Sequence, residues 1–166
     1  GTFSFIVTDD NGCNRTFTTT MSQPAPVAPN GSITNVSCNG FCNGSATVSP
    51  TGGTGPYTYS WVSATSTPST ATTSTIGTLC IGPVSVTVTD SKTCTATYTA
   101  NITQPPPITL TVTKTDLNCG NVCNGTASVT ATGGTGPFTY SWSPSGGTGA
   151  QATGLCAGSY TCTVTN

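Results

Sequence analysis

Cysteine is the residue type in this chain whose chemistry is easiest to infer, because there are nine cysteines among 166 residues. The chain has no histidine, so zinc could be bound only through four cysteines. Cysteine at this density in a chain without histidine is typical of disulfide bonding in an oxidising compartment. We therefore expect disulfides, with a four-cysteine zinc site as the alternative.

Carboxylate chemistry has little support, because the chain has only four acidic residues, all of them aspartates. Asp9 and Asp90 each end an apolar, alternating run before a turn, where a carboxylate commonly caps the backbone. Asp9, Asp10 and Asn11 could alternatively offer three oxygens to Ca²⁺. The turn after Asp90 does not repeat that set. We therefore predict no enzyme activity, no metal and no cofactor.

The low charge of the chain excludes two classes of partner. There are only three lysines and arginines, and they are scattered, so no cluster can neutralise nucleic acid phosphates. A basic face or a long apolar run, which membrane insertion requires, is also lacking. Threonine, the commonest residue, favours strands, whereas Gly, Pro, Thr and Ser disfavour helix. We therefore predict an all-β protein without significant helix.

One ten-residue stretch occurs twice and sets the repeat. Residues 52–61 read GGTGPYTYSW, and residues 133–142 read GGTGPFTYSW, 81 residues later. The glycines and proline predict a tight turn, and the alternating aromatics that follow predict a half-buried strand. These aromatics could stack on sugars, but their place after a turn on one strand face favours core packing. They are Tyr57, Tyr59, Trp61, Phe138, Tyr140 and Trp142.

The ends of the chain repeat its middle. Residues 82–94 resemble residues 1–13, and the proline-rich residues 104–107 resemble residues 23–26. Proline ends strands and stiffens linkers, so we interpret both proline-rich stretches as linkers. This predicts three segments. Residues 1–24 are the last strands of a preceding module, residues 25–105 a complete module, and residues 106–166 the first part of a further module completed by the next unit.

Short strands separated by turn signals fill the complete module. The loop between the strands near Trp61 and Ile76 is rich in Ser, Thr, Ala and Pro and is predicted to be exposed. Strands of this length and spacing predict an antiparallel β-sandwich. Alternating threonines in 109–113 could match a repetitive surface such as ice, but that spacing ends after one strand. The predicted strands are 33–36, 45–49, 57–62, 75–79, 84–89 and 95–102.

These motifs together resemble a known family. Cys-Asn-Gly at 38–40, GGTGPYTYSW at 52–61, Asp-Asp-Asn-Gly-Cys at 9–13 and Thr-Gln-Pro at 103–105 are similar to the SprB repeat. The resemblance implies tandem immunoglobulin-like or PKD-like β-sandwich modules in secreted surface adhesins of Bacteroidetes. It also implies an extracellular, cell-surface location and no catalytic residues.

The resemblance suggests how the cysteines pair. The ordinary repeat carries one pair, which corresponds here to Cys38 and Cys94, and the two further cysteines of the complete module are predicted to pair together. Four cysteines allow three connectivities, so the family motif makes this choice. Cys162 stands where Val86 stands and is predicted to be buried and free. The predicted pairs are Cys38–Cys94, Cys42–Cys80 and Cys123–Cys156.

The same correspondence predicts assembly. Cys119 repeats Cys38 and Cys13 repeats Cys94, so each is expected to find its partner in a neighbouring unit. We predict that residues 1–23 complete the module begun at Pro106 of the preceding unit. The expected partners are copies of the chain in a head-to-tail filament or long repeat array, with one continuous polypeptide favoured over strand exchange.

The sequence thus favours a structural repeat of an extracellular filament or adhesin stalk, joined head-to-tail and cross-linked by disulfides. The alternative function is a glycan-binding module, or one that binds another cell-surface ligand. Six Asn-x-Ser/Thr motifs are candidate glycosylation sites. They are Asn14, Asn30, Asn35, Asn43, Asn101 and Asn124.

Overall fold

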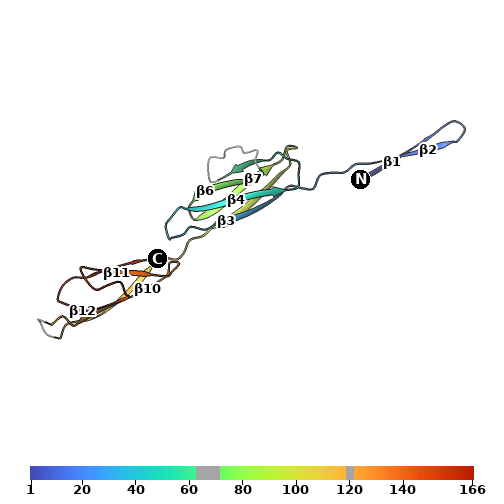
Figure 1. Cartoon of the computed structure of the whole chain (residues 1–166). Helices are drawn as coiled ribbons and strands as arrows, with labels where there is room; N and C mark the ends of the chain where they lie inside the picture. Colours follow the sequence, from blue (N-terminus) through green and yellow to red (C-terminus); the bar gives the residue numbers. More distant parts are fainter. Residues whose placement is uncertain (63–71, 119–121) are drawn as a thin grey trace. The chain divides into compact units, whose positions relative to one another are not determined.

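The computed structural model describes residues 1–62, 72–118 and 122–166, and in these residues every regular element is a β-strand (Figure 1). The exposed 63–71 segment predicted from composition lies outside the described residues. None of the described residues belongs to a helix long and apolar enough to cross a membrane. The predicted all-β fold without significant helix is confirmed.

Within the described residues the strands form five sheets, and the pairings β1–β2, β5–β7, β9–β10, β10–β12 and β11–β13 are antiparallel. The sheet orders are β1-β2, β3-β4-β6, β5-β7-β8, β12-β10-β9 and β11-β13. The strands are β1 Thr2–Thr8, β2 Asn14–Thr20, β3 Ala28–Thr34, β4 Gly44–Thr51, β5 Thr58–Trp61, β6 Ser74–Leu79, β7 Gly82–Thr89, β8 Thr95–Ile102, β9 Thr109–Thr115, β10 Gly125–Thr132, β11 Thr139–Ser143, β12 Gln151–Leu155 and β13 Thr161–Thr165.

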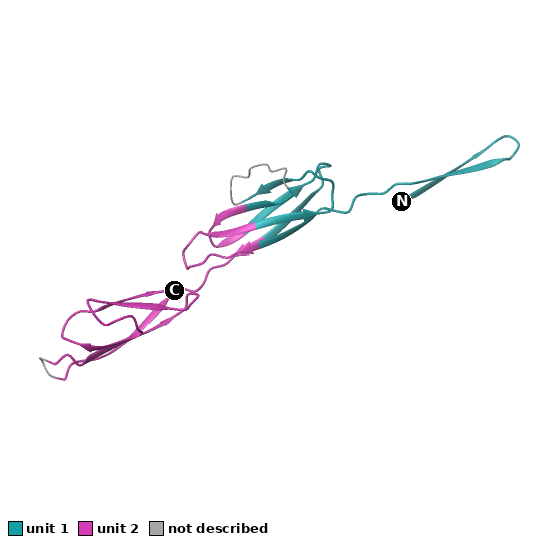
Figure 2. Ribbon diagram, viewed as in Figure 1, with its two compact units in different colours: residues 1–32, 47–75, 84–99 teal, residues 33–46, 76–83, 100–166 magenta. Residues whose placement is uncertain are grey.

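Contacts between residues divide the chain into two compact units (Figure 2). Unit 1 comprises residues 1–32, 47–75 and 84–99, and unit 2 comprises residues 33–46, 76–83 and 100–166. The limits of both units fall within strands β3, β4, β6, β7 and β8. The module limits suggested by the proline-rich linkers stay a prediction.

Strands β4 and β7 show why the middle of the chain folds as two layers. Burial alternates along both strands, so each presents one apolar face, with Ala46 and Val48 on β4 and Val86 and Val88 on β7. Two sheets that each bury one face form the layers of a β-sandwich. The finer assignment to an immunoglobulin-like topology stays a prediction.

One predicted strand is misplaced. We expected residues 33–36, but β3 spans Ala28–Thr34. The strand ends there because the Asn35 side chain takes the place of a strand partner, and its Oδ1 accepts a hydrogen bond of 2.9 Å from the Thr103 amide. Pro29 fits β3 because β3 is an edge strand, where a missing backbone donor is tolerated. Strand β8 has the predicted limits.

Strands β1 and β2 form a hairpin whose residues are all exposed. Phe5 lies opposite Phe17, and their ring centroids are 5.2 Å apart. Phe3, Ile6 and Val7 are also more than half exposed. An isolated two-stranded hairpin is only marginally stable in water, so this apolar surface needs a further sheet to cover it.

Candidate functional site

Each copy of the repeated turn is bonded to the proline-rich linker before it. The Gly53 amide donates to the Ala25 carbonyl at 2.7 Å, and the Gly134 amide donates to the Pro106 carbonyl at 2.9 Å. Gly53 has φ of 63° and Gly134 of 58°, a region that side chains other than glycine rarely adopt. The glycine pairs of the motif therefore fix the turn against the linker.

Asp90 links the turn that follows β7 to the repeated glycine-rich turn through hydrogen bonds. Its Oδ2 accepts from the Thr54 amide at 2.9 Å, and its Oδ1 accepts from the amides of Lys92 at 2.9 Å and Cys94 at 2.8 Å. The side chain is only 6% exposed. Desolvation disfavours the charged form, but the hydrogen bonds from Thr54, Cys94 and Lys92 outweigh it and lower the pKa of this carboxyl.

Asp9 performs the same capping at the tip of the β1–β2 hairpin. Its Oδ1 accepts from the amides of Asn11 at 3.0 Å and Cys13 at 2.8 Å. The carboxylate thus caps the backbone of its own turn, which is the role that the sequence analysis favours for Asp9. No group of three metal-ligating side chains that could hold an ion occurs among the described residues.

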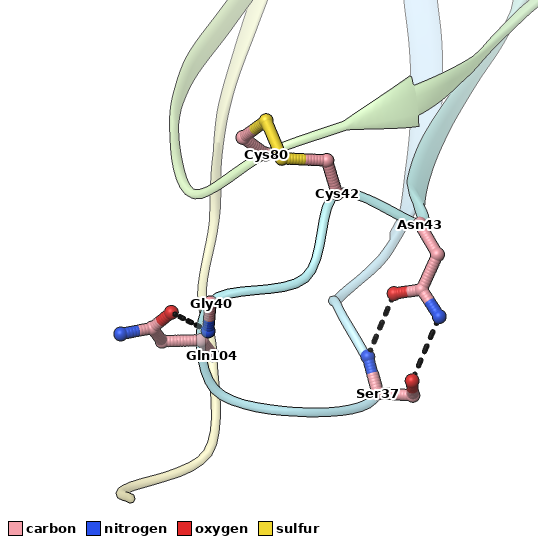
Figure 3. Close-up of a disulfide and its surroundings, with 6 residues drawn as sticks. All are labelled: Ser37, Gly40, Cys42, Asn43, Cys80 and Gln104. Carbon is pink, nitrogen blue, oxygen red and sulfur yellow. Dashed lines mark hydrogen bonds between the residues drawn. A yellow bond between two sulfur atoms is a disulfide. The ribbon is translucent and has the colours of Figure 1, made fainter.

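Two disulfides close equivalent loops, Cys42–Cys80 and Cys123–Cys156, with Cα–Cα distances of 3.9 and 4.0 Å. Both are pairs that the sequence analysis predicts. Figure 3 shows the first bond and the loop before it, where Asn43 Oδ1 accepts from the Ser37 amide at 3.0 Å. The Gly40 amide in the same loop donates to Gln104 Oε1 at 3.0 Å.

The predicted Cys38–Cys94 disulfide is wrong, because both cysteines are free. Cys94 directly precedes β8, whereas the loop carrying Cys38 is bonded to residues that follow β8, since Asn39 Nδ2 donates to the Pro105 carbonyl at 3.2 Å. Eight strand residues at about 3.3 Å each separate those positions by roughly 26 Å. Disulfide-bonded cysteines have Cα atoms at most about 7 Å apart.

The remaining cysteines are assigned as follows. Cys13 is free and exposed, so it forms no disulfide within the described residues. Cys119, its predicted counterpart in inter-unit bonding, lies outside them. Cys162 is free, but it is half-buried against a cluster containing Trp142, not fully buried as predicted. Among the described residues β13 has only β11 beside it, whereas β7, which carries Val86, lies between β5 and β8.

The repeated aromatics contribute to cores. Tyr59, Trp61 and Trp142 are less than 9% exposed, so their rings cannot form a sugar-stacking surface. The indole nitrogen of Trp61 donates to Ser74 Oγ at 3.0 Å, and that of Trp142 donates to the Gly149 carbonyl at 2.9 Å. Burial raises the pKa of the Tyr59 hydroxyl, with Tyr57 as the second cause. The Tyr57 hydroxyl itself donates to the Gly52 carbonyl.

A groove of about 510 Å³ opens in unit 2 along the sheet that contains β9 and β10. We name it the strand groove. Its lining includes Leu117, Gly125, Trp142, Leu155 and Tyr160. By sequence, Gly125 corresponds to Gly44, and a Cβ placed on Gly44 would lie 3.0 Å from Ile102 Cγ2. The strand groove therefore lies where β8 places Ile102 in the earlier copy.

Residues 30–66 and 111–149 match the family model of the SprB repeat. These two stretches of the chain are similar to the SprB repeat. No curated protein and no solved structure matches the chain. The SprB repeat is a structural repeat module of secreted surface proteins, and the two disulfides fit such a location. The family resemblance predicted from the motifs is thereby confirmed.

We call residues 28–102 the first SprB repeat and residues 109–165 the second. Sequence reasoning missed the strand groove. The six candidate glycosylation sites are all exposed. Four of their side chains make hydrogen bonds, and among the described residues those of Asn14 and Asn101 make none.

Proposed function

We propose that this chain is a structural segment of an extracellular filament or adhesin stalk, in which SprB repeats join head-to-tail by strand completion. The observation that carries the proposal is the strand groove of the second repeat. The first repeat fills the same place with β8, whose Ile102 is 1% exposed. A sheet edge and an apolar groove side by side are what β-strand addition requires.

Strand β2 of a following unit is the occupant that we propose. Residues 14–21 correspond to residues 95–102, so Met21 corresponds to Ile102. Met21 is 64% exposed in this chain, although it stands at a core position of the repeat. Moving one such side chain into a core contributes about 1.5–3 kcal/mol. Strand β2, which is paired with β1 in this chain, exchanges that partner for β13, whose free edge gains a hydrogen-bonded neighbour.

This joining would produce a fibre. The strand groove and the β1–β2 hairpin are different surfaces, so contact between them is heterologous and does not close into a symmetric dimer. Within the described residues the disulfides and the near absence of charge support a role outside the cell. Glycan binding gains less support, because Tyr59, Trp61 and Trp142 are buried and the other three aromatic rings proposed for it are partly buried.

Sedimentation velocity of the full chain tests the proposal. We expect association that increases with concentration while the two disulfides within the repeats are intact, and that is weakened by Met21→Asp. Ile81→Asp is the matched control, because Ile81 is an exposed aliphatic residue outside both β2 and the strand groove. A chain that stays monomeric at all concentrations, or a control that weakens association equally, would contradict head-to-tail joining.

The native assembly distinguishes one long polypeptide from exchanged strands. After reduction, a continuous array stays very large on a denaturing gel, whereas exchanged subunits migrate near the 16.5 kDa of this chain. Head-to-tail completion is contradicted if the native material, before denaturation, has only the 16.5 kDa mass of a single copy of this chain.

A further inference from the structure

Free cysteines lie at both ends of the first SprB repeat, Cys38 at one end and Cys94, the counterpart of Cys13, at the other. Cys38 lies at the end where the chain leaves the first repeat. Its neighbour Asn39 donates to the Pro105 carbonyl at 3.2 Å, and Cys38 lines a hollow with Pro106, Pro107 and Asn166, all within unit 2. Cys38 is therefore beside the linker that leads out of its repeat.

Cys94 lies at the end where the chain enters the first repeat. The Cys94 amide donates a hydrogen bond to the Asp90 carboxylate, which also accepts one from the Thr54 amide. The amide of Gly53, next to Thr54, donates to the Ala25 carbonyl in the entry linker. Cys94 also lines a hollow with that linker, within unit 1. A cysteine in the turn after β7 is therefore beside the linker that leads into its repeat.

The second repeat has the same arrangement around its own entry linker. Gly134 donates to Pro106 at 2.9 Å, and Asn166, which corresponds to Asp90, donates to Thr135 Oγ1 at 3.1 Å. A turn cysteine four residues beyond the Asn166 position would thus lie beside Pro106. Cys38 lies beside Pro105 and Pro106, so both sulfurs would meet at one linker.

We infer that Cys38 forms a disulfide across the repeat junction with Cys13 of the following unit. This inference rests on the proposed head-to-tail assembly. Strand β2 pairs with β1 in this chain, with Asn14 opposite Thr8, and Thr8 corresponds by sequence to Thr165. If β2 exchanged β1 for β13 in the same register, Asn14, and so Cys13, would lie at the Asn166 end of β13. Cys13 stands in the place of Cys94, directly before its strand, and is exposed and free. Cys119 repeats Cys38 but lies outside the described residues, so we rest the inference on Cys13 and Cys38.

The bond forms by thiol–disulfide exchange with a small-molecule disulfide. The Cys13 thiolate attacks that oxidant and releases one thiol, and the Cys38 thiolate then attacks the mixed disulfide and releases the second. Two protein thiols are oxidised, the oxidant is reduced to two thiols, and the two cysteine protons are transferred to them through solvent. The junction disulfides would link successive units, while Cys42–Cys80 and Cys123–Cys156 close loops within repeats.

Oxidation of the full chain with a mixture of oxidised and reduced glutathione tests the inference. We expect linked species on a non-reducing gel, with one peptide joining Cys13 to Cys38. Cys13→Ser and Cys38→Ser should each abolish that peptide and its linked species. Cys162→Ser, which removes another free cysteine, should leave both unchanged. Cys38 joined to Cys94, or linked species that persist in the Cys38 variant, would overturn the inference.

Sedimentation of the Cys13→Ser variant, which keeps the two disulfides within the repeats, separates assembly from the junction disulfide. If this variant associates and the parent chain gives no Cys13–Cys38 peptide on oxidation, head-to-tail assembly stands and the junction disulfide is wrong. Chains that neither associate nor link contradict both. Association that becomes resistant to dilution only after oxidation, with the Cys13–Cys38 peptide present, supports both.

Discussion

The two SprB repeats have closely similar sequences and the same turn and disulfide, but their cores are closed to different degrees. In the first repeat Ala46, Val86 and Tyr59 are at most 3% exposed. Their counterparts in the second, Ala127, Cys162 and Tyr140, are only partly buried. The first repeat has β8 beside β7, whereas β13 has no neighbour other than β11 within the described residues. One strand therefore decides whether this set of residues forms a closed core.

The same comparison shows which features do not depend on that strand. Trp61 and Trp142 are both buried, and both indole nitrogens have an acceptor. The loop before each disulfide is held in the same way, since Asn43 accepts from Ser37 and Asn124 accepts from Asn118. Each repeat therefore forms its turn and its disulfide locally, and the last strand adds closure.

Removing the disulfides should produce the largest difference between the repeats. Cys42 and Cys80 are 38 residues apart, and Cys123 and Cys156 are 33 apart. Loops of this size give each bond about 3–4 kcal/mol of stability. We expect Cys42→Ser with Cys80→Ser to weaken the first repeat by that amount and leave it folded. Cys123→Ser with Cys156→Ser should unfold the second, because a small open core supplies little more than that.

Fluorescence in urea measures both effects, because each repeat contains one tryptophan. Trp142→Phe leaves Trp61 to report the first repeat, and Trp61→Phe leaves Trp142 to report the second. Equal losses in the two repeats would mean that β8 does not account for their difference.

Adding the last strand should remove most of the remaining difference. We propose a variant in which residues 91–105 are copied after Asn166, with the copy of Cys94 changed to Ser. The copy of Tyr98 becomes Phe, the residue that β2 carries at the corresponding position, Phe17. The copied Ile102 should enter the strand groove, stabilise the second repeat by about 1.5–3 kcal/mol and suppress association. Trp142, which lines the groove, reports the change in urea.

The control for this variant carries the same extension with the copied Ile102 changed to Asp. It supplies the same backbone but no side chain that the strand groove can bury. If both extensions stabilise the second repeat equally, the groove is not the place of Ile102. If neither does, strand completion is wrong.

The sequence predicted the repeat, the all-β fold and the Cys42–Cys80 and Cys123–Cys156 pairs, because repeated text reveals which positions correspond. It misassigned Cys38 and Cys94, because correspondence does not reveal that β8 separates them. The end of β3 was missed for a local reason, since the Asn35 side chain, and not a strand partner, satisfies the Thr103 amide. The strand groove depends on a neighbour that β13 lacks among the described residues, which composition and motif cannot show.

Acid should affect the first repeat more than the second. Hydrogen bonds lower the pKa of Asp90 in the fold, so its stabilising contribution is complete above the unfolded pKa of about 3.9 and is lost as pH falls through the folded value. Asn166 in the same position does not titrate. We expect the urea midpoint reported by Trp61 to decrease when the pH is lowered below about 4. Asp90→Asn should flatten this pH dependence, whereas Asp116→Asn, at an exposed carboxylate, should not.

The smallest expected difference concerns the tryptophan acceptors. Trp61 donates to the Ser74 hydroxyl, which Ser74→Ala removes, whereas Trp142 donates to the Gly149 backbone carbonyl, which no side-chain change removes. Ser74→Ala should weaken the first repeat by about 1 kcal/mol, because a buried indole N–H loses its partner. The urea midpoint reported by Trp61 measures this, with Ser60→Ala on the exposed side of β5 as the control. An unchanged midpoint would mean that water replaces the hydroxyl, and the two repeats would then hold their tryptophans equally well.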